Sequence, residues 1–282
     1  MAKMNNDEYN AKVESLKGDY RSLNRFVMEH TYEMCQEEPL SLLTEGTKAG
    51  QYVLYEKDPL FAVKDGPTTN IVISSKRTLE AARQYYLEGK TVAVLNFANN
   101  HCPGGSPYYA GAQEESLCRI TNLYPCLLKE KETFYQKHSD SFKKGLLDYM
   151  GNSDLIYTSL VTVFKTDESA PKMLEKKDWY LVNVITCAAP ELYEMPSNLK
   201  DYKNSIILPR LRRVFEVAKG EGVQVLVLGA WGCGAFNNPP RIIAEAFKEL
   251  CGDYHFDTIE FAIDTSRGPN ANYEVFKETF DK

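Results

Sequence analysis

Two continuous apolar runs limit the folds that are open to this 282-residue chain. Residues 91–97 read TVAVLNF and residues 223–231 read VQVLVLGAW, and neither run alternates apolar with polar positions. Strands that are buried on both faces have this character. Stretches with helical spacing separate the apolar runs along the chain. We therefore expect an α/β fold, with a mixed or mainly parallel sheet flanked by helices on both faces.

The other elements are expected to follow the same alternation of strand and helix. Further strands are predicted at residues 71–74, 157–164, 180–186 and 258–263, and helices at 76–87, 113–132, 205–219 and 239–250. Gly89 is expected to cap the first helix, and Pro125 to kink or divide the second.

The N-terminal region has a different pattern. Residues 7–35 are expected to form one or two exposed helices, followed by a polar stretch at 36–50 and a short strand at 52–55. We predict a mainly helical N-terminal extension at residues 1–67, packed on a core domain at residues 68–282.

Composition argues against several functional classes. The formal net charge of −6 and a pI near 5.4 disfavour a broad nucleic-acid-binding face. No stretch approaches the roughly 20 apolar residues of a membrane span, and the polar N-terminus lacks the apolar core of a signal peptide. The four histidines show no metal-ligand spacing, so no metal is expected. Seven scattered cysteines indicate reduced thiols and a cytoplasmic location.

The loop after the first apolar run brings backbone donors close to acids. Asn99 follows the strand, Gly104 and Gly105 come next, and Glu114 and Glu115 stand at an expected helix start. Ligands of open α/β sheets bind beyond the carboxyl ends of the strands, and glycines let the backbone approach a phosphate. This pairing predicts an enzyme acting on a phosphorylated sugar or nucleotide. An ordinary turn, followed by acids favoured by the helix dipole, would give the same residues.

The position of the acids creates an electrostatic conflict. A helix N-terminus lowers the pKa of a carboxylate, whereas a general acid needs a pKa raised towards the working pH. A bound diphosphate would raise the pKa by like-charge repulsion. We therefore expect the acid to become competent when substrate is bound.

A second glycine loop follows the second apolar run. Gly229, Gly232 and Gly234 alternate with larger residues before a helix that opens at residues 239–240. Such a loop can present N–H groups to phosphate oxygens, although it fits neither the Walker nor the dinucleotide pattern. Phe236 is suited to stacking on a base, and packing of Phe236 and Trp231 in the core is an equal alternative.

Five segments together resemble a known family. LNFANNHCPGGS, AQEESLCR, ITCAAPELY, LVLGAWGCGAFNNPP and FAID occur in the order seen in bacterial-type poly(ADP-ribose) glycohydrolases (PARGs). The resemblance runs from about residue 68 to 280, and the segment before it is similar to that family's helical N-terminal extension. The family has a macrodomain-like catalytic core and a signature of three glycines followed by Gln-Glu-Glu. Here Gly104, Gly105 and Ser106 precede Gln113, Glu114 and Glu115.

The resemblance implies a role for each matching residue. Glu115 would protonate the departing ribose oxygen and then activate water, and Glu114 would hydrogen-bond the ribose hydroxyls. The implied substrate-binding residues are Gln113, Asn99, Gly104, Gly105, Ser106, Gly232, Cys233, Gly234, Ala235 and Phe236, with Phe236 against the adenine. The implied partner is ADP-ribose or poly(ADP-ribose). No cofactor or metal is implied, because the diphosphate of the substrate can supply the charge that an oxocarbenium-like transition state needs.

Ser106 departs from the family signature, which has a third glycine here. Its Cβ would narrow the ribose site or forbid a backbone dihedral that glycine allows. Three functions therefore stay open: exo-cleavage of poly(ADP-ribose), binding of ADP-ribose without turnover, and hydrolysis of mono-ADP-ribosyl or ester linkages.

Overall fold

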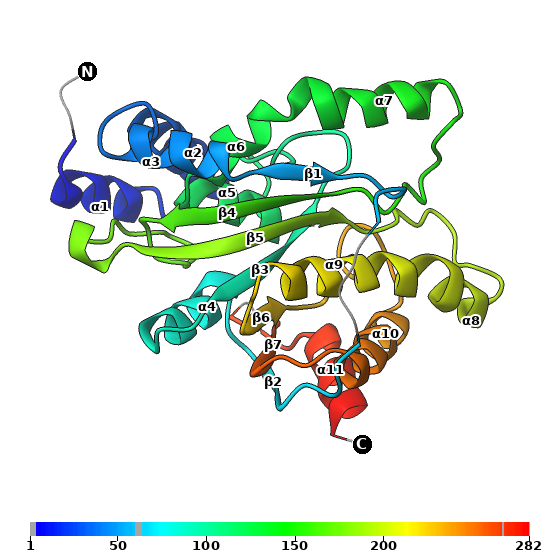
Figure 1. Cartoon of the computed structure of the whole chain (residues 1–282). Coiled ribbons are helices and arrows are strands. Elements are labelled where there is room, and N and C mark those ends of the chain that lie inside the picture. Colours follow the sequence, from blue (N-terminus) through cyan, green and yellow to red (C-terminus); the bar gives the residue numbers. More distant parts are fainter. Residues whose placement is uncertain (1–3, 60–63, 267, 282) are drawn as a thin grey trace.

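A seven-stranded mixed sheet forms the centre of the molecule (Figure 1). The computed structural model describes residues 4–59, 64–266 and 268–281. Residues 1–3, 60–63, 267 and 282 of the two predicted domains therefore lie outside the described residues. The strands are β1 (Tyr52–Leu54), β2 (Asn70–Ser74), β3 (Val92–Ala98), β4 (Leu155–Val163), β5 (Tyr180–Ala188), β6 (Val225–Leu228) and β7 (Thr258–Ala262). Their order is β1-β4-β5-β3-β6-β7-β2. β4 runs antiparallel to β1 and β5, and the other neighbouring pairs are parallel.

Helices cover both faces of this sheet. They are α1 (Asn6–Ser15), α2 (Tyr20–Met34), α3 (Leu40–Ala49), α4 (Thr78–Leu87), α5 (Gln113–Ile120), α6 (Leu123–Lys129), α7 (Gln136–Lys143), α8 (Leu199–Tyr202), α9 (Leu208–Gly220), α10 (Pro240–Asp253) and α11 (Ala271–Phe280). On β3, Ala93 and Leu95 enter a core shared with α9, α10 and α11, whereas Val92 and Val94 pack with α4, α5 and α6. Because alternate side chains of a strand point to opposite faces, a strand covered on both sides is apolar throughout. The expected α/β sheet with helices on both faces is confirmed.

Four helices were not expected from the sequence: α3, α7, α8 and α11. α3 occupies most of the stretch predicted to be merely polar, and α11 lies beyond the last predicted strand. The buried positions of α3 are Leu40, Thr44 and Thr47, so two of three are hydroxyl residues. Thr47 Oγ1 donates to Leu43 O and Leu160 O, both at 3.0 Å. Hydrogen-bonded threonines thus replace the apolar stripe that usually reveals a helix.

The helix predicted at residues 113–132 is divided, but not at Pro125. The break between α5 and α6 lies at Thr121 and Asn122, where Thr121 is extended and bridges Val163. Asn122 Oδ1 accepts a hydrogen bond from Thr162 N at 2.8 Å. Pro125 stands in the first turn of α6, where a missing N–H costs no helical hydrogen bond. Contacts with β4, rather than the proline, therefore set the break.

The N-terminal helices are packed on the core and only their outer sides are exposed. Tyr9, Val13, Leu23 and Val27 are buried, which corrects the expectation of exposed helices. α2 contacts α5, and β1 is the edge strand beside β4. A division of the chain at residue 67 remains a proposal.

Candidate active site

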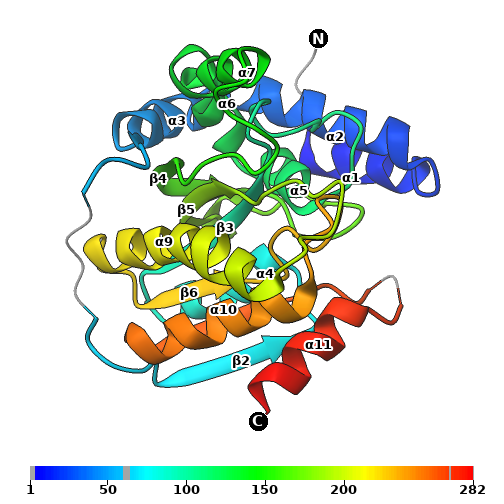
Figure 2. The ribbon, with the colours of Figure 1, turned by 90° about the vertical axis from the view of Figure 1, so that its right-hand side faces the viewer.

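The carboxyl ends of β3, β5 and β6 lie at one edge of the sheet, and the loops that follow them meet around the start of α5 (Figure 2). Gln113, the first residue of α5, fixes this helix to β3. Its Oε1 accepts from Phe97 N at 2.9 Å, and its Nε2 donates to Leu95 O at 2.8 Å and to Thr78 Oγ1 at 3.1 Å. The side-chain amide of Gln113, a residue expected to bind substrate, therefore forms its hydrogen bonds within the protein. It positions the two acids that follow.

Glu114 is almost completely buried, with 3% of its surface exposed. Its Oε1 accepts from Asn96 Nδ2 at 3.2 Å, and its Oε2 accepts from Asn99 N at 2.7 Å. Burial raises the pKa of Glu114 to about 8; the two hydrogen bonds oppose this shift and the charge of Glu115 adds to it. The expectation that the helix N-terminus would leave a lowered pKa is wrong for Glu114, because desolvation outweighs the helix dipole.

The raised pKa of Glu114 makes a prediction about stability. A group whose folded-state pKa exceeds its ordinary value of 4.5 favours the folded state below that value and loses this contribution as the pH rises towards 8. The free energy of unfolding should therefore fall with pH in this window, with a contribution from Glu114 of up to about 1.4 kcal/mol per pH unit. Urea unfolding at several pH values should show a smaller slope for Glu114→Gln. An identical slope would contradict a protonated Glu114.

Glu115 faces the first glycine loop. Its Oε1 accepts from Ser106 N at 3.1 Å. Within the described part of the chain, Glu115 Oε2 forms no hydrogen bond, whereas both oxygens of Glu114 accept one. The Glu115 carboxyl therefore keeps one oxygen available to a reacting group.

Two glycines let this loop lie against the acids. Gly104 and Gly105 have φ angles of +69° and +64°. A Cβ at Gly105 would lie 2.5 Å from Glu115 Oε1, and one at Gly104 would lie 2.8 Å from the ring of Tyr124. Ser106 is exposed and does not take a positive φ. Ser106 therefore occupies the place of the family's third glycine without backbone strain.

Asn99 shapes the entrance to the same loop. Its Oδ1 accepts from His101 N at 2.8 Å and from Cys102 N at 2.9 Å, while its own N–H holds Glu114. Asn99 thus connects the end of β3 and the following turn to Glu114.

The second glycine loop depends on Asn238, a buried residue that the sequence analysis missed. Its Nδ2 donates to Pro190 O at 2.8 Å and to Gly232 O at 3.0 Å, and its Oδ1 accepts from the hydroxyl of Tyr202. Trp231 is fully buried and donates to Cys187 O at 2.8 Å, so it is a core residue. A lone asparagine in a loop has no periodic signal that would have revealed this role.

The outer part of this second loop is accessible. Gly234 and Ala235 are exposed, and Cys233 is half-buried. Phe236 is also half-buried. Part of its ring packs against the core, as the core alternative expects, and the other part is accessible to solvent.

Gly232 and Gly234 form a matched pair for a stability prediction. A Cβ at Gly232, where φ is +73°, would lie 2.5 Å from Ala189 Cβ and 2.7 Å from Asn238 Nδ2, whereas one at Gly234 would have no neighbour within 4 Å. Gly232→Ala should lower the free energy of unfolding by about 2–4 kcal/mol, from overpacking and left-handed backbone strain. Gly234→Ala should change it by less than about 1 kcal/mol. Equal losses in urea unfolding would contradict this assignment.

A cavity of about 250 Å³ lies between the start of α5, the second glycine loop and the end of β7. It is lined by Arg77, Thr78, Phe97, Gly111, Ala112, Gln113, Ser116, Leu117, Asp167, Ala230, Gly234, Ala262, Ile263, Asp264, Asn270 and Asn272. Its wall combines apolar side chains with a few amides and carboxylates, as ligand pockets do.

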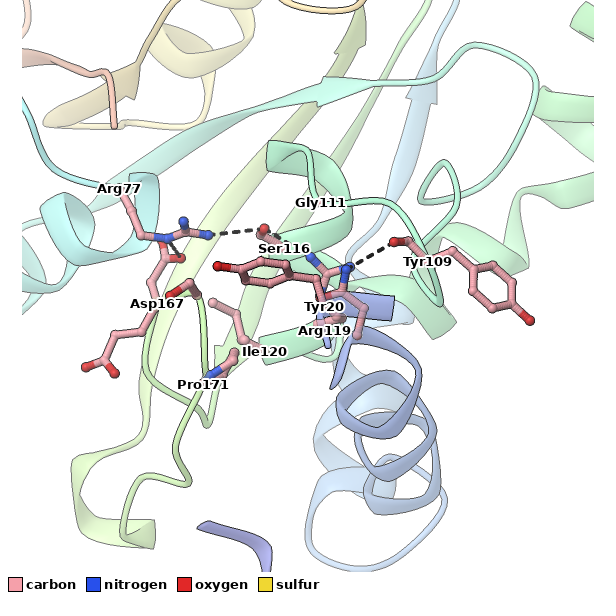
Figure 3. A pocket seen from close by; sticks show the side chains of 12 residues that line it. Tyr20, Arg77, Tyr109, Gly111, Ser116, Arg119, Ile120, Asp167 and Pro171 are labelled. Carbon is pink, nitrogen blue, oxygen red and sulfur yellow. Dashed lines mark hydrogen bonds and ion pairs between the residues drawn. The ribbon is translucent and has the colours of Figure 1, made fainter. Parts of the chain in front are cut away.

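An arginine network holds α5 from the side (Figure 3). Arg77 pairs with Asp167 at 2.7 Å and donates to Ser116 Oγ at 3.2 Å. Arg119 donates to the same oxygen at 3.3 Å and to Pro107 O at 2.9 Å. Ser116 follows the acid pair directly, so these arginines tie the first turn of α5 to the glycine loop. The hollow beside them, about 200 Å³, has Tyr20 of α2 on its wall.

Among the described residues, no three His, Cys, Asp or Glu side chains gather in a way that could hold a metal ion. No helix in the described ranges is both long and apolar enough to cross a bilayer.

Comparison with protein families shows which family has this sequence pattern. The family described as "Microbial-type PARG, catalytic domain" matches residues 24–166, half of the chain. The chain belongs to the microbial-type PARG family. The match starts within α2, so this family's catalytic domain includes helices of the predicted extension. Among curated proteins, none matches the chain.

Solved PARG structures share the fold. The poly(ADP-ribose) glycohydrolase of Thermomonospora curvata has 28% identity and a TM-score of 0.81, covering 91% of this chain and 99% of that chain. The same enzyme bound to the inhibitor ADP-HPD has 26% identity and a TM-score of 0.78, covering 90% and 98%. The Deinococcus radiodurans enzyme in complex with ADP-ribose has 28% identity and a TM-score of 0.72, covering 84% and 97%. The resemblance found in the sequence is confirmed.

Proposed function

We propose that this microbial-type PARG hydrolyses the ribose–ribose O-glycosidic bond at the end of poly(ADP-ribose) and releases ADP-ribose. One observation carries the proposal: the Glu115 carboxyl, 8% exposed, is held by Ser106 N against the Gly104-Gly105 loop with one oxygen available. A single oriented acid beside a loop suited to sugar and phosphate supports this proposal.

The reaction requires two proton transfers, one from Glu115 to the leaving oxygen and one from water back to Glu115. Glu115 gives its proton to the departing 2′-oxygen as the bond to C1″ of the terminal ribose breaks. Its carboxylate then takes a proton from the water that adds to C1″, which restores the acid. Burial raises the pKa of Glu114 to about 8, which favours its neutral form and so reduces the charge beside Glu115 and the diphosphate. A neutral Glu114 suits a residue that positions ribose hydroxyls.

The two loops and the cavity suggest how ADP-ribose would lie. We place its adenine in the 250 Å³ cavity, with Phe236 near its edge, and its diphosphate between the two loops. The diphosphate would contact Gly104, Gly105 and Ser106 on one side and Gly232, Cys233, Gly234 and Ala235 on the other. The distal ribose would then reach Asn99, Glu114 and Glu115. Backbone N–H groups suffice for this anion, in keeping with the negative net charge of the chain.

Incubation of the purified chain with poly(ADP-ribose) and chromatography of the products tests the proposal. ADP-ribose should be the released product. A reader of ADP-ribose, the alternative raised by Ser106, would bind ADP-ribose in calorimetry and release nothing. Release only from mono-ADP-ribosylated protein or from an ADP-ribose ester would support the third function instead.

We also propose a cytoplasmic location for this chain. All seven cysteines are free, and five of them are buried. Free thiols are typical of a reducing compartment.

A further inference from the structure

Four aromatic rings form a continuous series at the surface beside the candidate active site. His101 meets Phe142 with ring centroids 5.5 Å apart, Phe142 meets Tyr149 at 4.8 Å, and Tyr149 meets Tyr193 at 4.3 Å. All three contacts are edge-to-face. Tyr149 and Tyr193 are 49% and 67% exposed, although large aromatic side chains usually bury most of their surface. We call His101, Phe142, Tyr149 and Tyr193 the aromatic ladder.

The ladder connects the two glycine loops. At its inner end, His101 N donates to Asn99 Oδ1 at 2.8 Å. At its outer end, the neighbours of Tyr193 are fixed by backbone hydrogen bonds: Glu191 N to Tyr149 O at 2.9 Å, and Leu192 N to Phe236 O at 3.0 Å. The exposed rings are therefore held in place relative to both loops.

The sheet order puts the ladder and the adenine cavity on opposite sides of the acid pair. The cavity is lined by residues that follow β2, β6 and β7, by Phe97 of β3 and by the start of α5, whereas the ladder comes from segments that precede β4 and follow β5 and β3. Since the order is β4-β5-β3-β6-β7 and α5 begins over the end of β3, the acids stand between them. When the terminal ADP-ribose occupies the cavity, the rest of the polymer lies on the other side of the acids. This is the side of the ladder.

We propose that the ladder binds the adenine of the penultimate ADP-ribose unit of the polymer. This inference rests on the proposed function. The leaving oxygen is the 2′-oxygen of an adenosine, so an adenine lies one sugar beyond the scissile bond. A mono-ADP-ribosylated side chain presents no base there. Exposed aromatic rings bind nucleic bases by stacking, whatever the base.

The loops that carry Tyr149 and Tyr193 are suited to bind a ligand by stacking rather than by charge. Lys143 and Lys144 lie beside the ladder and are exposed. The loops at residues 144–154 and 189–198, which carry Tyr149 and Tyr193, also contain three acidic residues: Asp148, Glu191 and Glu194. The hydroxyl of Tyr193 donates to Glu191 Oε1 at 3.1 Å, which holds the ring of Tyr193. The penultimate unit should therefore be bound with little dependence on salt.

The experiment compares the unmodified chain with the double variant Tyr149→Ala/Tyr193→Ala. Initial rates of ADP-ribose release are measured against the concentration of polymer ends, and ADP-ribose binding is measured by calorimetry. The double variant should show a KM roughly tenfold higher, which corresponds to about 1.4 kcal/mol, with kcat and ADP-ribose affinity within twofold. Tyr149→Phe/Tyr193→Phe keeps the rings and should restore most of the lost affinity.

Leu146→Ala/Met195→Ala is the matched control. These side chains are 77% and 60% exposed on the same loops but carry no ring. This control should keep the KM of the unmodified chain. A KM that is unchanged in the alanine ladder variant, or equally raised in the control, contradicts the ladder and leaves the glycohydrolase proposal intact. No release of ADP-ribose by the unmodified chain contradicts the proposed function itself.

Discussion

Glu115→Gln should lower kcat for release of ADP-ribose from poly(ADP-ribose) by roughly 10³-fold, the typical contribution of a general acid–base residue. Glutamine keeps the shape of the side chain and can still accept from Ser106 N, which lies 3.1 Å from Glu115 Oε1. It cannot donate a proton to the leaving oxygen or take one from water. The affinity for ADP-ribose should stay within a few-fold, because the two loops are untouched.

Steady-state release and calorimetry, run on the same preparations, measure this separation of catalysis from binding. Glu132→Gln, at an exposed glutamate on a different helical turn, provides the control and should keep full activity. A Glu115→Gln chain that retains its kcat would remove Glu115 from the role of acid. The neighbouring Glu114, whose pKa is raised by burial, would then be the next candidate.

Gly105→Ala should have the second largest effect, with kcat reduced roughly 10²-fold. Its Cβ would stand 2.5 Å from Glu115 Oε1 and 3.2 Å from Glu114 Oε2, so the carboxyls or the loop must shift. A displacement of about 1 Å is enough for a loss of this size. The φ of +64° adds left-handed strain, which lowers stability as well.

Gly89→Ala separates these two causes. Gly89 has a φ of +77°, and a Cβ there would have no neighbour within 4 Å. It should share the loss in urea-unfolding stability with Gly105→Ala while keeping kcat. Full activity in Gly105→Ala would show that the loop does not hold the acid in its reacting position.

The elements that position the site could be predicted because burial on both faces leaves a direct mark on the sequence. β3 and β6 are continuous apolar runs, and the parallel order of their neighbours follows from the helices between them. α3 could not be predicted in this way, since its buried face consists of Leu40, Thr44 and Thr47. The division at Thr121 and Asn122 depends on β4, about 40 residues further along the chain. Local sequence does not contain such contacts.

For the site, the glycines and acids were visible as motifs, but their supports were not. Asn238 and Asn96 act from buried positions through hydrogen bonds that only the folded chain creates. The raised pKa of Glu114 has the same origin, because desolvation depends on everything packed around the carboxyl. Ser106 looked like a defect in the sequence, yet in the structure its backbone N–H holds Glu115 and its φ is not positive.

A single-turnover assay shows whether this chain cleaves the polymer end with Glu115 as the acid. The purified chain is mixed in excess over polymer ends, quenched at intervals, and the ADP-ribose formed is quantified. We expect a first phase that releases one ADP-ribose per polymer end, with Glu115→Gln slower by about 10³-fold. No ADP-ribose from the unmodified chain, or release at equal rates from both proteins, would contradict it.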